Sequence, residues 1–195
     1  MIESQSFLNF IRSAPGMTVQ EEEEILDSFK AVALKSKEYF LREGEICKQI
    51  GYVVKGCFSY FQLLDSGRKS ILEFAFEDWW VGDLPSFLNK KPSGAFFQAL
   101  EDAELLCISR NAFERMMAAS AAFRYLFHLK TQTAYLKSLE RSPKDKAESA
   151  EEKYLRMLKD YPQIKQRVPH YDVAAYLGIT PESLSRIRKK IAKAR

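Results

Sequence analysis

Six short apolar or alternating runs lie between residues 32 and 109, and their close spacing limits the possible folds more than any other feature of the chain. Glycines or turn sequences separate most of these runs, with Gly44, Gly56 and Gly67 as examples. Short strands at this spacing are typical of antiparallel barrels and jelly rolls. The runs cover residues 39–41, 51–54, 57–64, 70–76, 95–100 and 103–108, so the sequence predicts a β jelly roll here.

Helical patterns flank the predicted jelly roll on both sides. The first forty residues are expected to be helical, because Thr18 and Glu21 fit a capping box and Ile25, Leu26 and Phe29 follow at helical spacing. A second helical pattern covers about residues 110–141.

This second pattern contains apolar positions that step by four and three residues, which is the a/d seam of a short coiled coil. We expect the seam to form a dimer interface, although Phe123 and Phe127 on the neighbouring ridge offer packing against the chain's own barrel, and both can hold at once. The seam consists of Ala122, Leu126, Leu129, Thr133 and Leu136.

A polar segment with a proline, residues 142–146, is the best candidate for a linker. Ser149 and Glu152 then form a second capping box that opens a helix running to Pro162. We therefore predict a domain of residues 1–141, which ends in the dimerisation helix, and a second domain of residues 142–195.

Positive charge is concentrated in the last quarter of the chain. Residues 146–195 hold 12 Lys and Arg against 6 Asp and Glu, whereas the 195-residue chain as a whole has a formal net charge of +4. A basic terminal domain on a slightly acidic body favours a polyanionic partner, and a solubilising basic tail is the alternative.

Several function classes are disfavoured. The two histidines, His128 and His170, are too few for a histidine-rich metal centre, and neither lies in a nucleophile motif. The three cysteines favour neither a disulfide framework nor an iron–sulfur cluster. The chain has no phosphate-binding glycine motif, no apolar run long enough for a membrane span and no N-terminal signal pattern. We expect a cytoplasmic protein that is not an enzyme, holds no metal or cofactor and does not contact a membrane.

Residues 168–191 carry the most specific pattern in the chain. A helix-turn-helix needs a small residue where two helices cross, a glycine in the turn and apolar residues that fix the crossing. Ala174 and Gly178 supply the first two, and Thr180 and Pro181 mark the N-cap and first residue of a second helix. The fixing residues are Val173, Leu177, Ile179, Leu184 and Ile187.

The outward face of this second helix suits a DNA major groove, because Arg can pair with guanine, Glu can accept from cytosine and Lys can neutralise phosphate. A solvated helical hairpin, with Glu182 and Arg186 paired to each other, is the alternative. The predicted DNA-contacting residues are Thr180, Pro181, Glu182, Ser183, Ser185, Arg186, Lys189 and Lys190.

The order of jelly roll, long helix, hinge and helix-turn-helix, together with the stretch LGITPESLSRIRKKI, resembles the catabolite activator (Crp/Fnr) family of bacterial transcription regulators. The resemblance implies a cyclic-nucleotide-binding type of jelly roll, a homodimer and a winged helix on a palindromic operator, with RNA polymerase as a further partner. The base-contacting Arg, Glu and Arg of the family correspond here to Pro181, Glu182 and Arg186. The change at Pro181 predicts a different operator sequence.

The resemblance also implies an effector pocket. The family's Gly-Glu pair for the sugar hydroxyl corresponds to Gly82-Asp83, followed by Leu84, and its Arg-Ser pair for the cyclic phosphate corresponds to Ser93-Gly94. A buried phosphate would lack its main charge-assisted partner here, because no Arg lies between Arg68 and Arg110. We expect an effector other than cyclic AMP.

The sequence thus predicts a homodimeric, sequence-specific DNA-binding transcription regulator with a small-molecule sensor domain. One alternative is a cyclic-nucleotide or small-metabolite binding module whose helical tail contacts protein. A cupin-type enzyme is disfavoured, because residues 32–109 contain no histidine to hold its metal.

Overall fold

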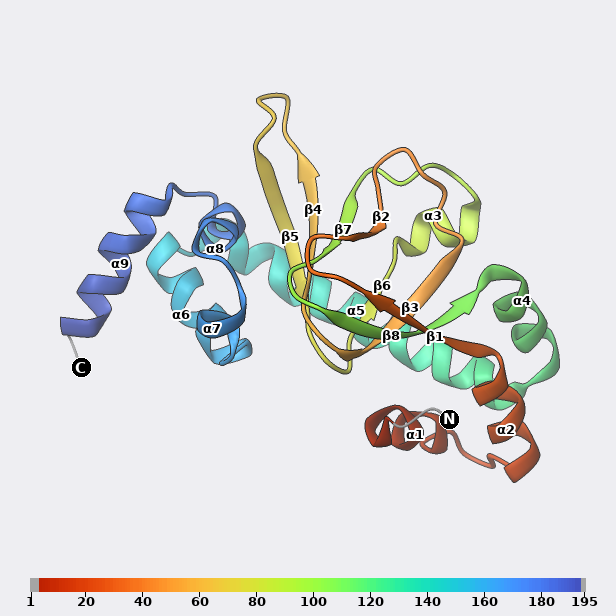
Figure 1. Cartoon of the computed structure of the whole chain (residues 1–195). Coiled ribbons are helices and arrows are strands. Elements are labelled where there is room, and N and C mark those ends of the chain that lie inside the picture. The colour runs from red at the N-terminus through yellow and green to blue at the C-terminus, as the bar shows by residue number, and fades with distance from the viewer. Residues whose placement is uncertain (1–3, 194–195) are drawn as a thin grey trace.

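Two four-stranded antiparallel sheets form the body of the molecule, which a computed structural model describes over residues 4–193, with the backbone alone for residues 140–147. One sheet has the order β1-β8-β3-β6 and the other the order β2-β7-β4-β5 (Figure 1). The predicted α+β fold with an antiparallel jelly roll is confirmed. The strands are β1 (Phe29–Leu34), β2 (Tyr39–Leu41), β3 (Gln49–Lys55), β4 (Phe58–Leu63), β5 (Lys69–Ala75), β6 (Trp80–Val81), β7 (Phe96–Ala99) and β8 (Ala103–Ser109).

A glycine between β3 and β4 allows the chain to pass close to the first residue of β8. Gly56 has a φ of +112°, and a Cβ at this position would lie 2.5 Å from the Cβ of Ala103. The turn signal that the sequence showed at Gly56 therefore has two causes, a left-handed backbone and a neighbour that leaves no space for a side chain.

The N-terminal region differs from the expectation of forty helical residues. Helices α1 (Gln5–Arg12) and α2 (Val19–Asp27) are present, and Thr18 and Glu21 form the expected capping box. The chain then becomes β1, in which Phe29 pairs with Ile108 of β8. The helical assignment of Phe29 was wrong, because pairing with a distant strand overrides local spacing.

The predicted long helix of residues 110–141 is two helices, α4 (Arg110–Ala119) and α5 (Ala121–Ala147). Ser120 breaks them with an extended backbone, and its hydroxyl accepts a hydrogen bond from the Phe123 N–H at 3.1 Å. Helix α5 also continues beyond Arg141 through the segment that was predicted to be a linker, and the chain leaves helical geometry only at residues 148–149. The division into two domains stays a prediction.

Residues 148–193 contain helices only. These are α6 (Ala150–Asp160), α7 (Ile164–Arg167), α8 (His170–Leu177) and α9 (Pro181–Lys193), and the predicted capping box of Ser149 and Glu152 opens α6. The β wing expected of a winged helix is absent from this described part of the chain. The recognisable element there is the pair α8 and α9.

Two apolar cores hold the molecule together. The larger core lies between the sheets and extends to α1, α4 and the first turns of α5, where Ala122, Phe123 and Leu126 are buried. The smaller core joins β4 and β5 to the C-terminal helices and includes Phe74, Met157 and Leu184.

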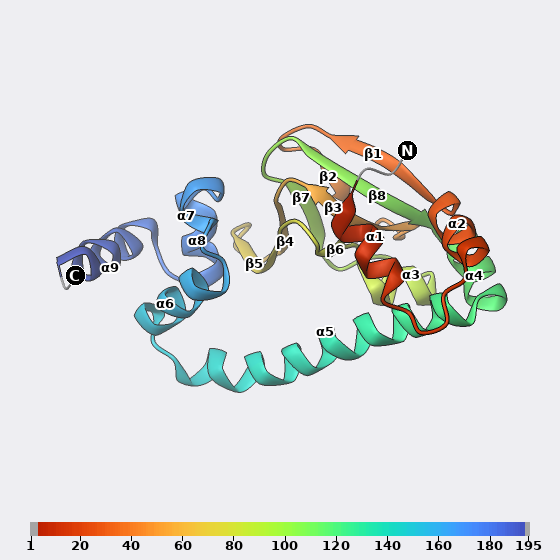
Figure 2. The same cartoon turned by 90° about the horizontal axis from the view of Figure 1, so that it is seen from below.

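The C-terminal helices therefore pack beside the β4–β5 hairpin, with α9 farthest from the barrel, while α5 runs along the barrel from α4 towards α6 (Figure 2). A short helix, α3 (Leu84–Asn89), connects β6 to β7. None of the described helices is long and apolar enough to cross a bilayer.

Candidate nucleic-acid interface and effector pocket

Helices α8 and α9 meet at a tight turn around Gly178. This glycine caps α8 in the left-handed conformation with a φ of +69°, and the following Ile179 N–H donates to the Ala174 carbonyl at 3.0 Å. Ala174 is 1% exposed and Leu184 is fully buried, so a small residue and a leucine close the helix crossing. The turn and crossing residues that the sequence singled out occupy the geometry they require.

The start of α9 is fixed from two sides. The Ser183 N–H donates to the Thr180 hydroxyl at 3.3 Å, as an N-cap requires. His170, the first residue of α8, places its Nε2 at 2.9 Å from the Pro181 carbonyl and at 3.3 Å from the Ser185 hydroxyl. The imidazole therefore connects α8 to α9, and the Ser185 hydroxyl is hydrogen-bonded to it.

The predicted contact face is largely open. Pro181, Glu182, Arg186 and Lys189 are exposed, and Ser183 is half-buried. Arg186 forms no salt bridge with any described residue, so the expected alternative pairing with Glu182 is not present as an ion pair. The Glu182 backbone N–H and the Thr180 hydroxyl lower the pKa of Glu182, and the nearby charge of Arg186 adds to this.

Two basic residues of α9 contact the chain itself. The Lys190 ammonium lies 2.6 Å from a carboxylate oxygen of Glu151 on α6, although 71% of the lysine side chain is exposed. Arg188 turns inward and stacks on the Tyr154 ring at 5.6 Å. The unpaired cations of the described part of this helix are therefore Arg186, Lys189 and Lys193.

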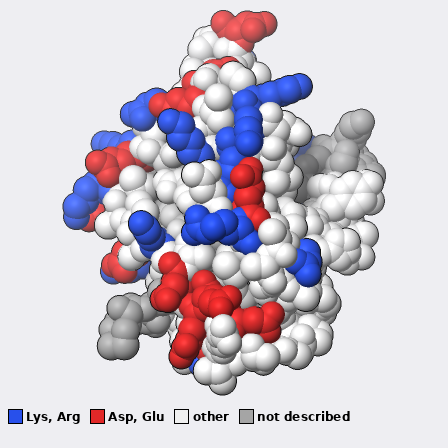
Figure 3. Space-filling view, turned by 90° about the vertical axis from the view of Figure 1, so that its right-hand side faces the viewer, with Lys and Arg blue, Asp and Glu red and all other residues white. Residues whose placement is uncertain are grey.

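The opposite end of the molecule carries a different charge pattern. Figure 3 shows this end with basic side chains across its middle and acidic side chains gathered towards its lower part. The acidic sequence of α2, residues 21–24, belongs to this end of the molecule. Basic and acidic side chains thus lie close together on this face of the molecule.

The predicted dimer seam divides into two parts. Ala122 and Leu126 are 5% and 2% exposed and pack into the larger core, so their place in an intermolecular seam was wrong. Leu129 and Leu136 are 37% and 52% exposed, and Thr133 is also exposed. Phe123 shares the buried face, because the first two turns of α5 close the barrel as the alternative interpretation described.

Helix α5 exposes three further apolar side chains that are not part of the predicted seam. Tyr125, Tyr135 and Leu139 are 44%, 62% and 51% exposed. Apolar side chains left open along one helix are a common mark of a protein interface.

A pocket of about 220 Å³ opens beside the start of α3. Gly82, Asp83 and Leu84 line it, as the resemblance implied, and Gly94 lines a neighbouring hollow of about 300 Å³. Aromatic rings form much of the first pocket's wall, namely Tyr60, Trp79, Trp80 and Phe97, and the carboxylate-bearing Glu73 completes it together with Ala75 and Pro85.

Ser93 does not line either hollow. It is 3% exposed, and its hydroxyl donates to the Asp83 carboxylate at 2.7 Å. The other Asp83 oxygen accepts from the Ser86 N–H at 3.0 Å and caps α3. The two positions that the resemblance assigned to the sugar and the phosphate of an effector are thus hydrogen-bonded to each other.

The electrostatics of the pocket oppose an anion. Burial raises the pKa of the Tyr60 phenol, and the nearby carboxylates of Asp83 and Glu73 raise it further. No arginine or lysine lines the first pocket, and Lys91 lines only the neighbouring hollow. Among the described residues, no three His, Cys, Asp or Glu side chains are grouped as metal ligands.

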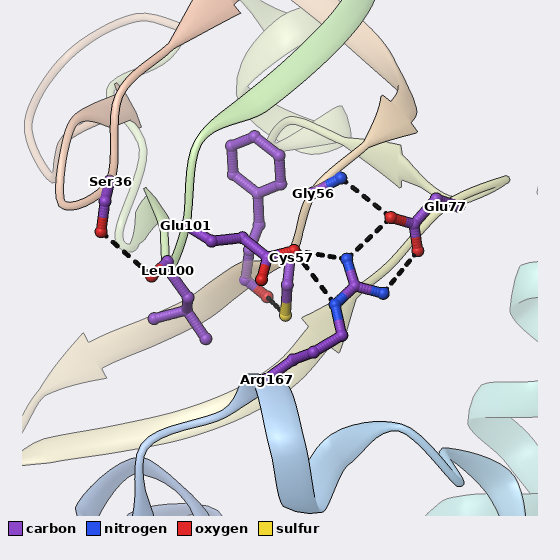
Figure 4. Close-up of polar contacts among 8 residues, drawn as sticks. Ser36, Gly56, Cys57, Glu77, Leu100, Glu101 and Arg167 are labelled. Carbon is purple, nitrogen blue, oxygen red and sulfur yellow. Dashed lines mark hydrogen bonds and ion pairs between the residues drawn. The ribbon is translucent and has the colours of Figure 1, made fainter.

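An ionic cluster that no sequence pattern predicted lies between the barrel and the C-terminal helices (Figure 4). Arg167 of α7 donates to both carboxylate oxygens of Glu77 at 2.7 Å and also pairs with Glu101. Burial raises the pKa of Glu77, but hydrogen bonds from Arg167 and from the Gly56 N–H outweigh it, so the pKa falls to about 2. Each partner comes from a loop or a short helix, where no periodic pattern marks a residue.

Asp172 of α8 was also not predicted. It is fully buried, and neither of its carboxylate oxygens has a hydrogen-bond partner among the described residues. Burial raises the pKa of Asp172, and the charge of Lys69 opposes this only in part.

Residues 31–120 match the family model of the cyclic nucleotide-binding domain. No curated protein sequence matches the chain significantly. Among solved structures, the chain is similar to a Crp/Fnr-family regulator of Eubacterium rectale, with 16% identity, a TM-score of 0.72 and coverage of 95% of this chain and 88% of that one.

Two further structures have the same fold. The c-di-GMP responsive regulator CLP of Xanthomonas campestris is 16% identical with a TM-score of 0.71, covering 91% of this chain and 93% of that one. FixK2 of Bradyrhizobium japonicum is 18% identical with a TM-score of 0.71 and covers 85% of both chains. These structures share the fold of this chain, so the expected resemblance to Crp/Fnr regulators is confirmed for the fold.

Proposed function

We propose that this chain, a cyclic nucleotide-binding domain followed by helices in the fold of Crp/Fnr regulators, is a homodimeric transcription regulator that binds a specific duplex DNA sequence. The exposed face of α9 carries the proposal, because Arg186, Lys189 and Lys193 form no ion pair with a described residue while a capped, tightly packed turn fixes the helix. A helix presented in this way fits the major groove.

Within this face, Arg186 lies less than two turns from the start of α9 and is proposed to contact a base edge, with Glu182 beside it. Lys189 lies about one turn further along and is proposed to contact phosphate. Lys190 contributes less than the sequence suggested, since Glu151 already compensates its charge.

The proposed dimer forms through the exposed apolar residues of α5, centred on Leu129 and Leu136. A two-fold dimer presents two copies of α9, and two copies bind a palindromic operator. RNA polymerase is a further proposed partner, and the signal is proposed to be a small molecule in the pocket beside α3, other than cyclic AMP.

Selection of duplexes from a random pool tests this proposal. We expect enrichment of an inverted repeat, with an affinity that falls steeply as salt rises, because bound lysines and arginines release counterions from phosphate. Recovery of no enriched sequence, together with a flat salt response, would refute it and would favour the alternative of a ligand-binding module whose helices contact protein.

A further inference from the structure

We propose that residues 76–83 couple the effector pocket directly to the helix-turn-helix, because this one segment lines the pocket and also holds the C-terminal helices. The inference rests on the proposed function and adds a route for its regulation. The segment connects β5 to α3 and passes through β6.

One side of the segment belongs to the pocket. Trp79, Trp80, Gly82 and Asp83 line it, which is half of the eight residues in the segment. Any occupant of the pocket therefore touches this segment.

The other side holds the helices that follow α5. Phe76 and Trp79 pack against Tyr161, the residue after α6, with ring centroids 5.5 Å and 5.8 Å apart. Glu77 between them forms the two-pronged ion pair with Arg167 of α7. Figure 4 shows the Arg167 guanidinium enclosed between Glu77 and Glu101, both of which belong to the barrel.

Strand β5, which leads into the segment, has the same two-sided character. Glu73 and Ala75 line the pocket, whereas Phe74 between them packs on Tyr176 of α8 at 5.6 Å. Alternate residues of a strand face opposite sides, so a shift of this strand moves the pocket wall and the seat of α8 together.

Trp79 is the residue that belongs to both sides. Its ring lines the pocket and contacts Tyr161, and the Lys137 ammonium of α5 lies 5.3 Å from the ring centroid. A packed aromatic ring transmits displacement because protein interiors have few voids to absorb it. A single side chain therefore connects the pocket to Tyr161 at the end of α6, and this route does not require α5 to change.

The test uses hydrogen exchange of the amides of residues 161–177 in the full chain. Leu84→Trp replaces a leucine that lines the pocket with a larger indole ring. Leu88→Trp makes the same substitution at an exposed position of α3 that does not line the pocket. We expect Leu84→Trp to make exchange in residues 161–177 faster by about fivefold, because the new ring displaces Trp79 from Tyr161, and Leu88→Trp to leave it unchanged.

The same pocket change is then made in chains that lack the shared contact. Trp79→Leu removes it from the barrel and Tyr161→Leu removes it from the helices, so one background remains informative if the other fails to fold. In both backgrounds we expect Leu84→Trp to have less than about a twofold effect on exchange.

An equal effect of Leu84→Trp with and without the contact overturns the inference, as does no effect in the otherwise unchanged chain. The exchange measurement needs no DNA. If exchange responds to Leu84→Trp as expected but no DNA sequence is enriched, only the proposed function is contradicted. If a DNA sequence is enriched but exchange does not respond, only this inference is contradicted.

Discussion

Replacement of Leu136 by alanine should weaken the dimer without unfolding the chain. Leu136 is 52% exposed on α5, so about half of its side chain remains available to a partner. Burial of a whole leucine contributes roughly 1.5–3 kcal/mol, so this half contributes about 1 kcal/mol. The residue occurs twice in a two-fold interface, which brings the loss to about 2 kcal/mol and the rise in the dimer Kd to about 30-fold.

Sedimentation equilibrium over a range of protein concentrations measures this Kd directly. The matched control is Leu126→Ala on the same helix, because Leu126 is 2% exposed within the core of its own chain. That variant should lose roughly 2–5 kcal/mol of unfolding free energy. A Leu136→Ala dimer whose Kd stays within about threefold of the unchanged chain would show that the exposed face of α5 is not the interface.

Three further predictions concern stability and the pocket. Asp172→Asn should raise the free energy of unfolding by about 1–2 kcal/mol at pH 7 in urea titrations, because it removes a buried carboxylate without a partner. The pKa of Asp172 is raised in the folded chain, so this advantage should disappear below the ordinary value of 3.8, where the carboxyl is protonated in both states; an advantage that persists at pH 3 would contradict the explanation. Gly178→Ala should cost about 1 kcal/mol of unfolding free energy, since alanine must adopt a φ of +69° at the turn, and an unchanged value would mean that the turn relaxes. Calorimetry with micromolar cyclic AMP should show no saturable heat, because no Arg or Lys lines the pocket to bind the cyclic phosphate, and a saturable heat would mean that another group binds it.

The parts of the fold that local sequence specifies were predictable. The capping boxes at Thr18 and Ser149 were found from two residues each, and the turn at Gly178 required a left-handed backbone that glycine adopts most easily. Strand β1 was missed, because its pairing with β8 joins residues almost eighty positions apart. No pattern within a short window contains that information.

The dimer seam shows a second limit of sequence reasoning. Leu126 and Leu136 fit the a/d pattern equally well, yet Leu126 is buried against its own barrel and Leu136 is exposed to solvent. Periodicity identifies an apolar face of a helix but not what covers it. Likewise, Arg167 and Glu77 are ninety positions apart, and only the folded chain brings the guanidinium to the carboxylate.

The central claim is that α9 contacts bases in a DNA groove, and affinity measurements on a panel of single-base operator variants test it most directly. The operator selected from the random pool is measured with the unchanged chain, with Arg186→Ala and with Lys189→Ala, both residues being exposed cations of the same helix. Arg186→Ala should cost roughly 1–3 kcal/mol and relax the preference at one base pair of each half-site. Lys189→Ala should weaken all sequences about equally and lower the salt slope by about one. A uniform loss across the panel for Arg186→Ala would contradict the claim.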